Sequence, residues 1–405
     1  MHVLILGARA PACLEWARAF RTAGWQVTAG DSLAWPVTRA SNAIHHYLRL
    51  PEPRTETHAW LAALKTYIET RAVDLVLPTC EEAFYLAHGR DHLPCRVMTP
   101  DFALMHRLHH KGWFAEMIRD WPVTAPETHV LASQAELTAF IQSSFPRMRE
   151  SSGSDNLDSR LRGNDVKDWV FKPAYSRFAN RALIRPTAEA LSNIRPTTDQ
   201  PWVAQRFVAG REHCSFSILL DGRLTAHACY HPRYRVGRGS GIWFEPTDPA
   251  PIRAFLEHFG TQTGYTGQVA FDFIETADGR CHAIECNPRA TSGVHLFDDQ
   301  PQALVAALLG GEGAKGILTP TAAPRQVALA MLLFAAPKHL FDHQFWRDYR
   351  RARDVVTRPG DRAPLPAQIP GLAEIIGRAI ARHSGLLAAA TADSEWNGQP
   401  MDALP

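Results

Sequence analysis

The sequence predicts a mixed α/β and α+β protein, with a parallel sheet near the N-terminus and antiparallel strands in its centre. Strand and helix patterns alternate over the first hundred residues, which is typical of parallel βαβ units. Residues 267–289 contain two apolar strands joined at Asp278-Gly279, a sequence typical of a hairpin turn. A chain of 405 residues is long enough for two or three such domains.

Bulk composition excludes several classes of function. The net charge is only +2, so we expect no nucleic-acid partner. No apolar run reaches the roughly 18 residues that span a bilayer, and the first residues read as a buried strand, so we expect no membrane partner. The seven cysteines are scattered and form no CxxC pair, which favours free thiols over a zinc site. These features predict a cytoplasmic protein.

The first hundred residues contain the candidate strands of the parallel sheet. They are apolar runs at residues 3–7, 25–32 and 73–82. Ligands bind at the carboxyl ends of such strands, so Gly7, Asp31 and Glu81 are expected at that edge. The sequence after Gly7 lacks the GxGxxG pattern of a dinucleotide site. Gly7 is therefore read as a tight turn, and a substrate-binding role for the edge stays open.

Two segments carry little chemistry. Residues 147–168 are rich in Ser, Asp, Arg and Gly, which predicts a disordered surface insertion. The tail, residues 313–405, contains no interpretable motif. Helices are predicted there at residues 326–334, 341–353 and 371–383. The tail is expected to finish an acceptor pocket or to build a dimer interface.

The clearest chemical signal is the sequence IECNPR at residues 284–289. Glu285 and Asn287 are two apart on one predicted strand, so they share a face, and Asp272 lies on the partner strand. Carboxylate and amide oxygens suit Mg²⁺, which completes its shell with phosphate and water oxygens. Apolar flanks argue against a solvent-facing acidic hairpin, because buried charges need partners. We therefore predict a metal site at Asp272, Glu285 and Asn287, with Arg289 beside it to hold a phosphoryl or carboxylate oxygen.

This pattern resembles the ATP-grasp superfamily, which includes biotin carboxylase, carbamoyl-phosphate synthetase, D-alanine ligase and the glycinamide ribonucleotide enzymes. The synthetase large chain also has a Glu, one apolar residue and then Asn-Pro-Arg. The resemblance implies an ATP-grasp fold with four regions. These are a preATP-grasp Rossmann-like domain at residues 1–100, an N-terminal lobe at 101–205, a C-terminal lobe with the metal site at 206–312, and an accessory region at 313–405.

The resemblance also implies residues that contact the ATP phosphates. Lys111, in HHKGWF, matches a lysine that approaches the phosphates, although a solvated helix lysine is the alternative. Lys172, in VFKPA, matches a strand lysine on the α- and β-phosphates, and a lysine in an apolar strand needs an anion. Residues 175–181 take the place of the family's glycine-rich flap but contain no glycine. Ser176 and Arg177 are therefore the expected donors there.

The hinge between the two lobes is implied at Gln205, Arg206, Phe207 and Val208, where backbone groups read the adenine edge. Gln205 stands at or near the place of a Glu that often binds the ribose in this family. Glu212 matches an acidic residue of the following strand, which orients the ribose or nearby basic residues. An exposed strand end is the alternative for Glu212.

A cationic, glycine-containing stretch at residues 230–246 lies where the family has a loop over the substrate and the γ-phosphate. His231 and Arg235 in this stretch suit an anionic acyl phosphate, and a bland surface loop is the alternative. Arg235 joins Lys172 and Arg289 as a catalytic candidate. A zinc site at His227 and His231 is not favoured, because no carboxylate or cysteine pattern surrounds them.

The implied activity is that of a ligase. It uses ATP and Mg²⁺, with Mn²⁺ as a substitute, to activate a small carboxylate as an acyl phosphate that an amine or similar nucleophile then attacks. One alternative is a carbamoyl-phosphate synthetase or carboxylase-like enzyme that uses carboxyphosphate, although no biotinyl motif or glutaminase domain is present. A non-catalytic ATP-binding protein is the other alternative. A homodimer is a further expectation.

Overall fold

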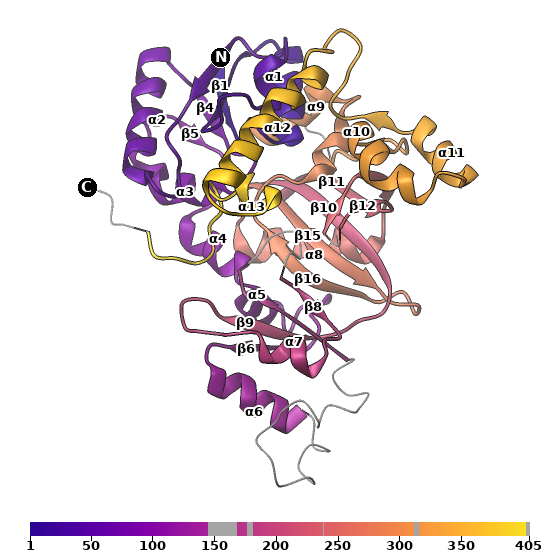
Figure 1. Ribbon diagram of the computed structural model, residues 1–405. Coiled ribbons are helices and arrows are strands. Elements are labelled where there is room, and N and C mark those ends of the chain that lie inside the picture. The colour runs from indigo at the N-terminus through magenta and orange to yellow at the C-terminus, as the bar shows by residue number, and fades with distance from the viewer. Residues whose placement is uncertain (145–167, 176–180, 238, 312–315, 402–405) are drawn as a thin grey trace.

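A computed structural model describes residues 1–144, 168–175, 181–237, 239–311 and 316–401 (Figure 1). Within these residues no helix is both long enough and apolar enough to cross a membrane. The N-terminal sheet has the strand order β3-β2-β1-β4-β5, and all of its pairs are parallel. Its strands are β1 (His2–Leu6), β2 (Gln26–Asp31), β3 (His46–Arg49), β4 (Leu75–Leu77) and β5 (Arg96–Val97).

Alternate residues of β1 bury the two faces of this sheet, as strand geometry requires. Val3 and Ile5 pack in the core that contains α1 (Pro11–Thr22). Leu4 and Leu6 pack in a second core with α2 (Thr57–Arg71) and α3 (Glu82–Gly89). The predicted parallel sheet is therefore confirmed, and it has helices on both faces.

A smaller antiparallel sheet has the order β6-β9-β7-β8. Its strands are β6 (Thr128–Leu131), β7 (Trp169–Pro173), β8 (Leu183–Ile184) and β9 (Trp202–Arg206). The core beneath it contains side chains of α6 (Gln134–Ser144) and α7 (Ala188–Ser192). Two short helices, α4 (Phe102–His109) and α5 (Lys111–Met117), connect this sheet to the N-terminal domain.

The largest sheet has seven strands in the order β16-β15-β10-β11-β14-β17-β18. Its strands are β10 (Arg211–Leu220), β11 (Arg223–Pro232), β14 (Trp243–Thr247), β15 (Gly267–Glu275), β16 (Cys281–Asn287), β17 (Arg325–Gln326) and β18 (Arg353–Asp354). Helix α8 (Ala250–Thr263) packs on one face through Phe255 and Phe259. On the other face, Phe216 and Tyr230 share a core with α1 and with α9 (Pro301–Leu309). The N-terminal domain therefore lies against the large sheet. A short hairpin, β12 (Arg235–Val236) and β13 (Ser240–Gly241), precedes β14.

The tail supplies the edge strands β17 and β18 and the helices α11 (His343–Arg351), α12 (Pro364–Ala381) and α13 (Leu386–Ala389). The helix predicted at residues 326–334 is wrong at its start. Gln326 pairs with Trp243, and its amide donates hydrogen bonds to Tyr349 O (2.8 Å) and Ala352 O (3.1 Å). Helix α10 covers only Ala328–Ala330, and wider and tighter helical turns follow it to Lys338.

Candidate active site

The acidic hairpin of β15 and β16 places three oxygen-bearing side chains on one face of the large sheet. Asp272 lies directly opposite Glu285, and Asn287 lies opposite Ala270. Opposite residues share a face, and so do residues two apart on one strand. The face shared by Asp272, Glu285 and Asn287 is therefore as predicted. The register shifts by one residue after Asp272, at a bulge of the kind often found beside functional sites.

Two lysines from different elements contact strand β16 of this hairpin. Lys111, the first residue of α5, places its Nζ 3.4 Å from Glu285 Oε2. Lys172, on β7, donates from Nζ to the carbonyl of Ile284 at 3.4 Å. Both side chains are almost fully buried, and the contact of Lys172 joins β7 of the smaller sheet to β16 of the larger one. The two ammonium groups thus sit between the two sheets, where an anion would find them.

The charges in this layer shift the pKa values in opposite directions. Burial raises the pKa of Asp272, and the negative charges of Glu285 and Glu212 raise it further. Burial alone would raise the pKa of Glu285 as well, but Lys111 and Lys172 outweigh burial and lower it. Burial lowers the pKa of Lys172 to about 8, although Glu285 opposes that shift. A site with two carboxyl groups and a lysine of lowered pKa suits a ligand that brings both negative charge and a cation.

Arg289 ties this hairpin to the N-terminal domain. Its Nη2 lies 3.1 Å from Asn287 Oδ1 and 3.5 Å from Glu81 Oε1. Glu81 follows β4 at the carboxyl edge of the parallel sheet, where the sequence predicted it. Arg289 therefore links the edge of the parallel sheet to the acidic hairpin.

The donor set suits a hard cation that keeps other ligands. Across the described ranges, no group of three or more His, Cys, Asp or Glu side chains is arranged to hold a metal ion. Asp272, Glu285 and the amide of Asn287 leave part of an octahedral shell to be filled from elsewhere. Mg²⁺ commonly takes those positions from phosphate oxygens and water. The residues present therefore fit a magnesium ion that arrives with a nucleotide.

Comparison with known proteins shows that this chain is similar in structure to several solved enzymes. No protein-family model matches the sequence, and no curated protein matches it either. An N5-carboxyaminoimidazole ribonucleotide synthetase, solved as an ADP complex, superposes with a TM-score of 0.59 at 13% identity over 80% of each chain. L-amino acid ligase from Bacillus licheniformis gives 0.54 at 13% identity, over 76% of this chain and 74% of the ligase. The biotin carboxylase domain of Hydrogenobacter thermophilus 2-oxoglutarate carboxylase gives 0.56 at 13% identity, over 78% and 72%.

The chain has the ATP-grasp fold. The two lobes of this fold are the smaller sheet and the large sheet described above. The metal and phosphate roles of individual residues, and the domain boundaries, stay predictions.

The hinge between the lobes of the ATP-grasp fold is the segment that joins β9 to β10. Gln205 is buried on β9, and its amide donates to Thr128 Oγ1 at 3.0 Å. The backbone N–H of Phe207 donates to Asp168 O at 2.6 Å, while Arg206 is exposed and Val208 is half-buried. Gln205 and Arg206 thus end β9 and Phe207 and Val208 follow it, and their role in reading the adenine edge stays a prediction.

Glu212 holds the residues expected to lie over the substrate. Its carboxylate contacts Arg235 Nη2 at 2.6 Å, and its carbonyl lies 2.8 Å from His231 Nδ1. Arg235 also donates to Gly239 O at 3.0 Å. Although burial lowers the pKa of Arg235, Glu212 raises it by more. Glu212 therefore contacts two of the predicted site residues, and its role toward the ribose or the basic residues stays a prediction.

Several predicted features fall outside the described residues. They are Ser176 and Arg177 of the phosphate flap and residues 147–167 of the polar insertion. Their roles stay predictions.

Sequence reasoning missed the contribution of the C-terminal segment. Trp396 is fully buried, stacks on Phe84 with ring centroids 5.0 Å apart, and donates its backbone N–H to Glu81 Oε2 at 3.4 Å. Nearby, His109 ends α4 beside Phe84, with ring centroids 4.8 Å apart. The adjacency of His109 to Lys111 in HHKGWF was the one signal for the histidine. No local pattern indicated Trp396.

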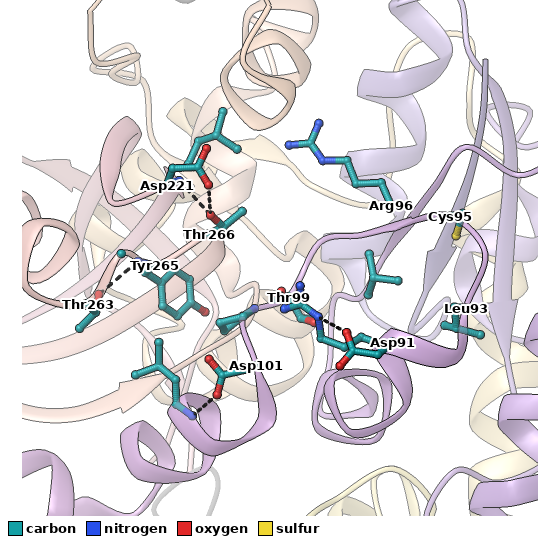
Figure 2. Close-up of a pocket in the computed structure, with 16 residues that line it drawn as sticks. Asp91, Leu93, Cys95, Arg96, Thr99, Asp101, Asp221, Thr263, Tyr265 and Thr266 are labelled. Atoms are coloured by element: carbon teal, nitrogen blue, oxygen red, sulfur yellow. Dashed lines mark hydrogen bonds and ion pairs between the residues drawn. The ribbon is translucent and has the colours of Figure 1, made fainter. Parts of the chain in front are cut away.

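A hollow of about 760 Å³ lies away from these residues, between the N-terminal domain and the large sheet (Figure 2). Arg96 and Asp101 line one side, and Asp221 and Thr266 line the other. None of the residues predicted to bind nucleotide or metal lines this hollow. It is therefore separate from the site between the lobes.

Proposed function

We propose that this protein is an ATP- and Mg²⁺-dependent ligase that activates a carboxylate as an acyl phosphate and joins it to an amine. The observation that carries the proposal is the layer in which Glu285 faces Lys111 at 3.4 Å, beside Lys172 and opposite Asp272. Its acidic face suits a metal ion, and its lysines suit the phosphates that such an ion neutralises.

The proposed reaction needs positioning more than covalent help from side chains. The substrate carboxylate attacks the γ-phosphorus of ATP, and ADP leaves. The amine then attacks the acyl carbon and loses a proton as phosphate departs. Asp272, Glu285 and Asn287 would hold Mg²⁺, which neutralises charge on the phosphates. Lys111 and Lys172 orient the triphosphate.

Arginines would hold the transferred group. Arg289, fixed by Asn287 and Glu81, is placed to hold an oxygen of the acyl phosphate or of the acid. Arg235, fixed by Glu212, would cover the anion from the next strands. A fixed guanidinium loses little freedom when it binds, which makes it effective at stabilising developing charge.

The similar structures support ligation of an acid to an amine, and one of them also supports carboxyphosphate chemistry as an alternative. The name of the L-amino acid ligase favours an acid and an amine as substrates. The biotin carboxylase domain was solved with MgADP and bicarbonate, which favours carboxyphosphate chemistry as the second candidate. Bicarbonate is therefore one of the acids to test.

The test is ADP release with Mg²⁺ and ATP across a library of carboxylic acids, bicarbonate included, each with and without amines. We expect one acid–amine pair to stimulate release, and Glu285→Ala to abolish it. Arg280→Ala, on the exposed hairpin turn, serves as the control that keeps activity. Release that persists unchanged in Glu285→Ala would refute the proposed site. Light scattering on the same preparation tests whether the protein forms the predicted homodimer.

A further inference from the structure

His109 is a buried histidine at the junction of the nucleotide lobe and the N-terminal domain. It is the last residue of α4 and is 4% exposed. On one side it packs against the rings of Phe84 (4.8 Å between centroids), Tyr175 (5.7 Å) and Trp396 (6.1 Å). These aromatic contacts fix the position of the imidazole.

The other neighbours of His109 are the charged groups of the proposed active site. Burial lowers the pKa of His109 well below its usual value, and the positive charges of Lys111 and Arg289 lower it further. Glu285 opposes this effect but does not overcome it. The ring is therefore neutral, with one nitrogen that donates and one that accepts.

The contacts of the ring assign these two roles. A backbone hydrogen bond with Trp396 favours the protonated ring, so the Trp396 carbonyl is the acceptor. Nε2 is buried and has no hydrogen-bond partner in the part of the chain that the structure describes. The nitrogen that donates to Trp396 is therefore Nδ1, and Nε2 is left as a bare acceptor. A buried acceptor without a partner costs about 1–3 kcal/mol, and a donor on a bound ligand would remove this cost.

The chemistry of Nε2 restricts what that ligand can be. A phosphate oxygen is itself an acceptor at neutral pH and cannot donate to Nε2. Mg²⁺ prefers oxygen ligands, and the cations of Lys111 and Arg289 beside the ring disfavour a metal ion on it. A group that carries an N–H or O–H can donate to Nε2. In the proposed reaction the amine nucleophile is such a group.

We propose that His109 Nε2 accepts a hydrogen bond from an N–H of the amine nucleophile and so turns the amine's lone pair toward the acyl carbon. His109 is then a specificity-determining residue of the acceptor pocket. The inference rests on the proposed ligase function. It extends that function by placing the amine beside Phe84, Trp396 and Arg289, where the N-terminal domain and the C-terminal segment meet.

The chain contains a matched control for this histidine. His227 on β11 is 1% exposed, has its Nδ1 2.9 Å from Ser217 Oγ, and also has a buried Nε2 with no partner among the described residues. Ser217 is three residues from Cys214, which lies opposite Asp272, so His227 is on the other face of the sheet. It therefore offers the same chemistry away from the proposed site.

The test uses the acid–amine pair found in the ADP-release screen and compares two substitutions. His109→Asn keeps an amide near the Nδ1 position and removes the Nε2 acceptor, whereas His109→Gln can place an amide oxygen near Nε2. We expect His109→Asn to raise KM for the amine roughly tenfold and to lower kcat/KM by roughly 5- to 100-fold. His109→Gln should recover most of this loss, and His227→Asn should leave both constants unchanged.

A second measurement separates the amine site from the chemistry before it. Hydroxylamine at high concentration traps an acyl phosphate as a hydroxamate without needing the amine pocket, so His109→Asn should form hydroxamate at the wild-type rate. An unchanged KM for the amine in His109→Asn, or an equal loss of kcat/KM in His227→Asn, would overturn the role of His109. Neither result would contradict the ligase function. Absence of acid-dependent ADP release and of hydroxamate in the wild type would overturn the ligase function and this inference with it.

Discussion

The depressed pKa of Lys172 predicts that ATP binding weakens as the pH rises through 8. Burial lowers this pKa from 10.5 to about 8, so the ammonium group loses its proton within an accessible range. Protonation is favoured below the pKa, and the positive charge that attracts the triphosphate is therefore present at pH 7 and mostly lost at pH 9. A lysine on the protein surface would keep its charge over the same range.

The size of the effect follows from the fraction of protonated Lys172. With a pKa near 8, about nine tenths of the molecules carry the charge at pH 7 and about one tenth carry it at pH 9. If only the charged form binds, affinity falls roughly tenfold, which is about 1.4 kcal/mol. Asp272 has a raised pKa and becomes negative as its proton leaves, which weakens binding of free ATP in the same direction. Glu285 stays ionised throughout, because its pKa is lowered.

Calorimetric titration of ATP without Mg²⁺ at pH 7, 8 and 9 and constant ionic strength measures this dependence. Lys172→Arg keeps a positive charge at every pH and should retain only the part of the slope that Asp272 causes. Lys172→Met should bind weakly at all three pH values. Equal slopes for the wild type and Lys172→Arg would show that Lys172 does not titrate in this range, and a flat wild-type profile would refute its contact with the phosphates.

Two further predictions concern stability, measured by urea unfolding. Arg9→Ala removes a guanidinium that contacts fully buried Asp393 at 2.6 Å, and it should lower the free energy of unfolding by about 3–5 kcal/mol. Arg280→Ala breaks an exposed ion pair and should lower it by less than about 1 kcal/mol. A cost below about 1 kcal/mol for Arg9→Ala would show that Asp393 finds other partners. Gly210→Ala would place a Cβ 2.2 Å from Glu275 O beside the hinge, and it should destabilise the protein by more than about 1 kcal/mol. Gly377→Ala adds a Cβ in open space within α12, and it should stabilise the protein by up to about 1 kcal/mol. Equal effects of the two glycine substitutions would refute the close packing at the hinge.

The acidic hairpin could be predicted from sequence because its geometry is local. A two-residue period decides which side chains share a face, and the turn at Asp278-Gly279 fixes which residues stand opposite one another. These local rules place Glu285 and Asn287 on one face and Asp272 on the partner strand. The bulge between Asp272 and the turn was not predicted, and the alignment depends on it, because the register on the turn side of the bulge would pair Asp272 with Ile284 instead of Glu285.

Helical patterns in the tail predicted its secondary structure less well, because packing against the large sheet overrides the local preference for helix there. The apolar run that begins at Gln326 reads as a helix, but Gln326 completes the edge of the large sheet and bonds two carbonyls near the end of α11. Edge strands of two residues leave almost no periodic signal. Their existence depends on the neighbouring strand, which the local sequence does not contain.

The contacts that close the site could not be predicted, since they join residues that are far apart in the chain. Arg9 and Asp393 are 384 residues apart, and Glu81 and Trp396 are 315 apart. Each looks like an ordinary surface charge or an ordinary core aromatic when read alone. Only the packed structure shows that Asp393 anchors the C-terminal segment at the edge of the parallel sheet.

This anchoring gives the tail a role in the site that its lack of motifs concealed. Arg9 and Arg378 hold Asp393 at 2.6 Å and 2.9 Å, and three residues later Trp396 packs against His109 and bonds Glu81. Glu81 in turn contacts Arg289 of the acidic hairpin at 3.5 Å, so the C-terminal segment, the parallel sheet and the proposed metal site form one chain of contacts. Removing the segment would take away the contacts of Trp396 with His109 and Glu81, while the acidic face would keep its own residues. The nucleotide and acceptor halves of the site therefore depend on different parts of the sequence.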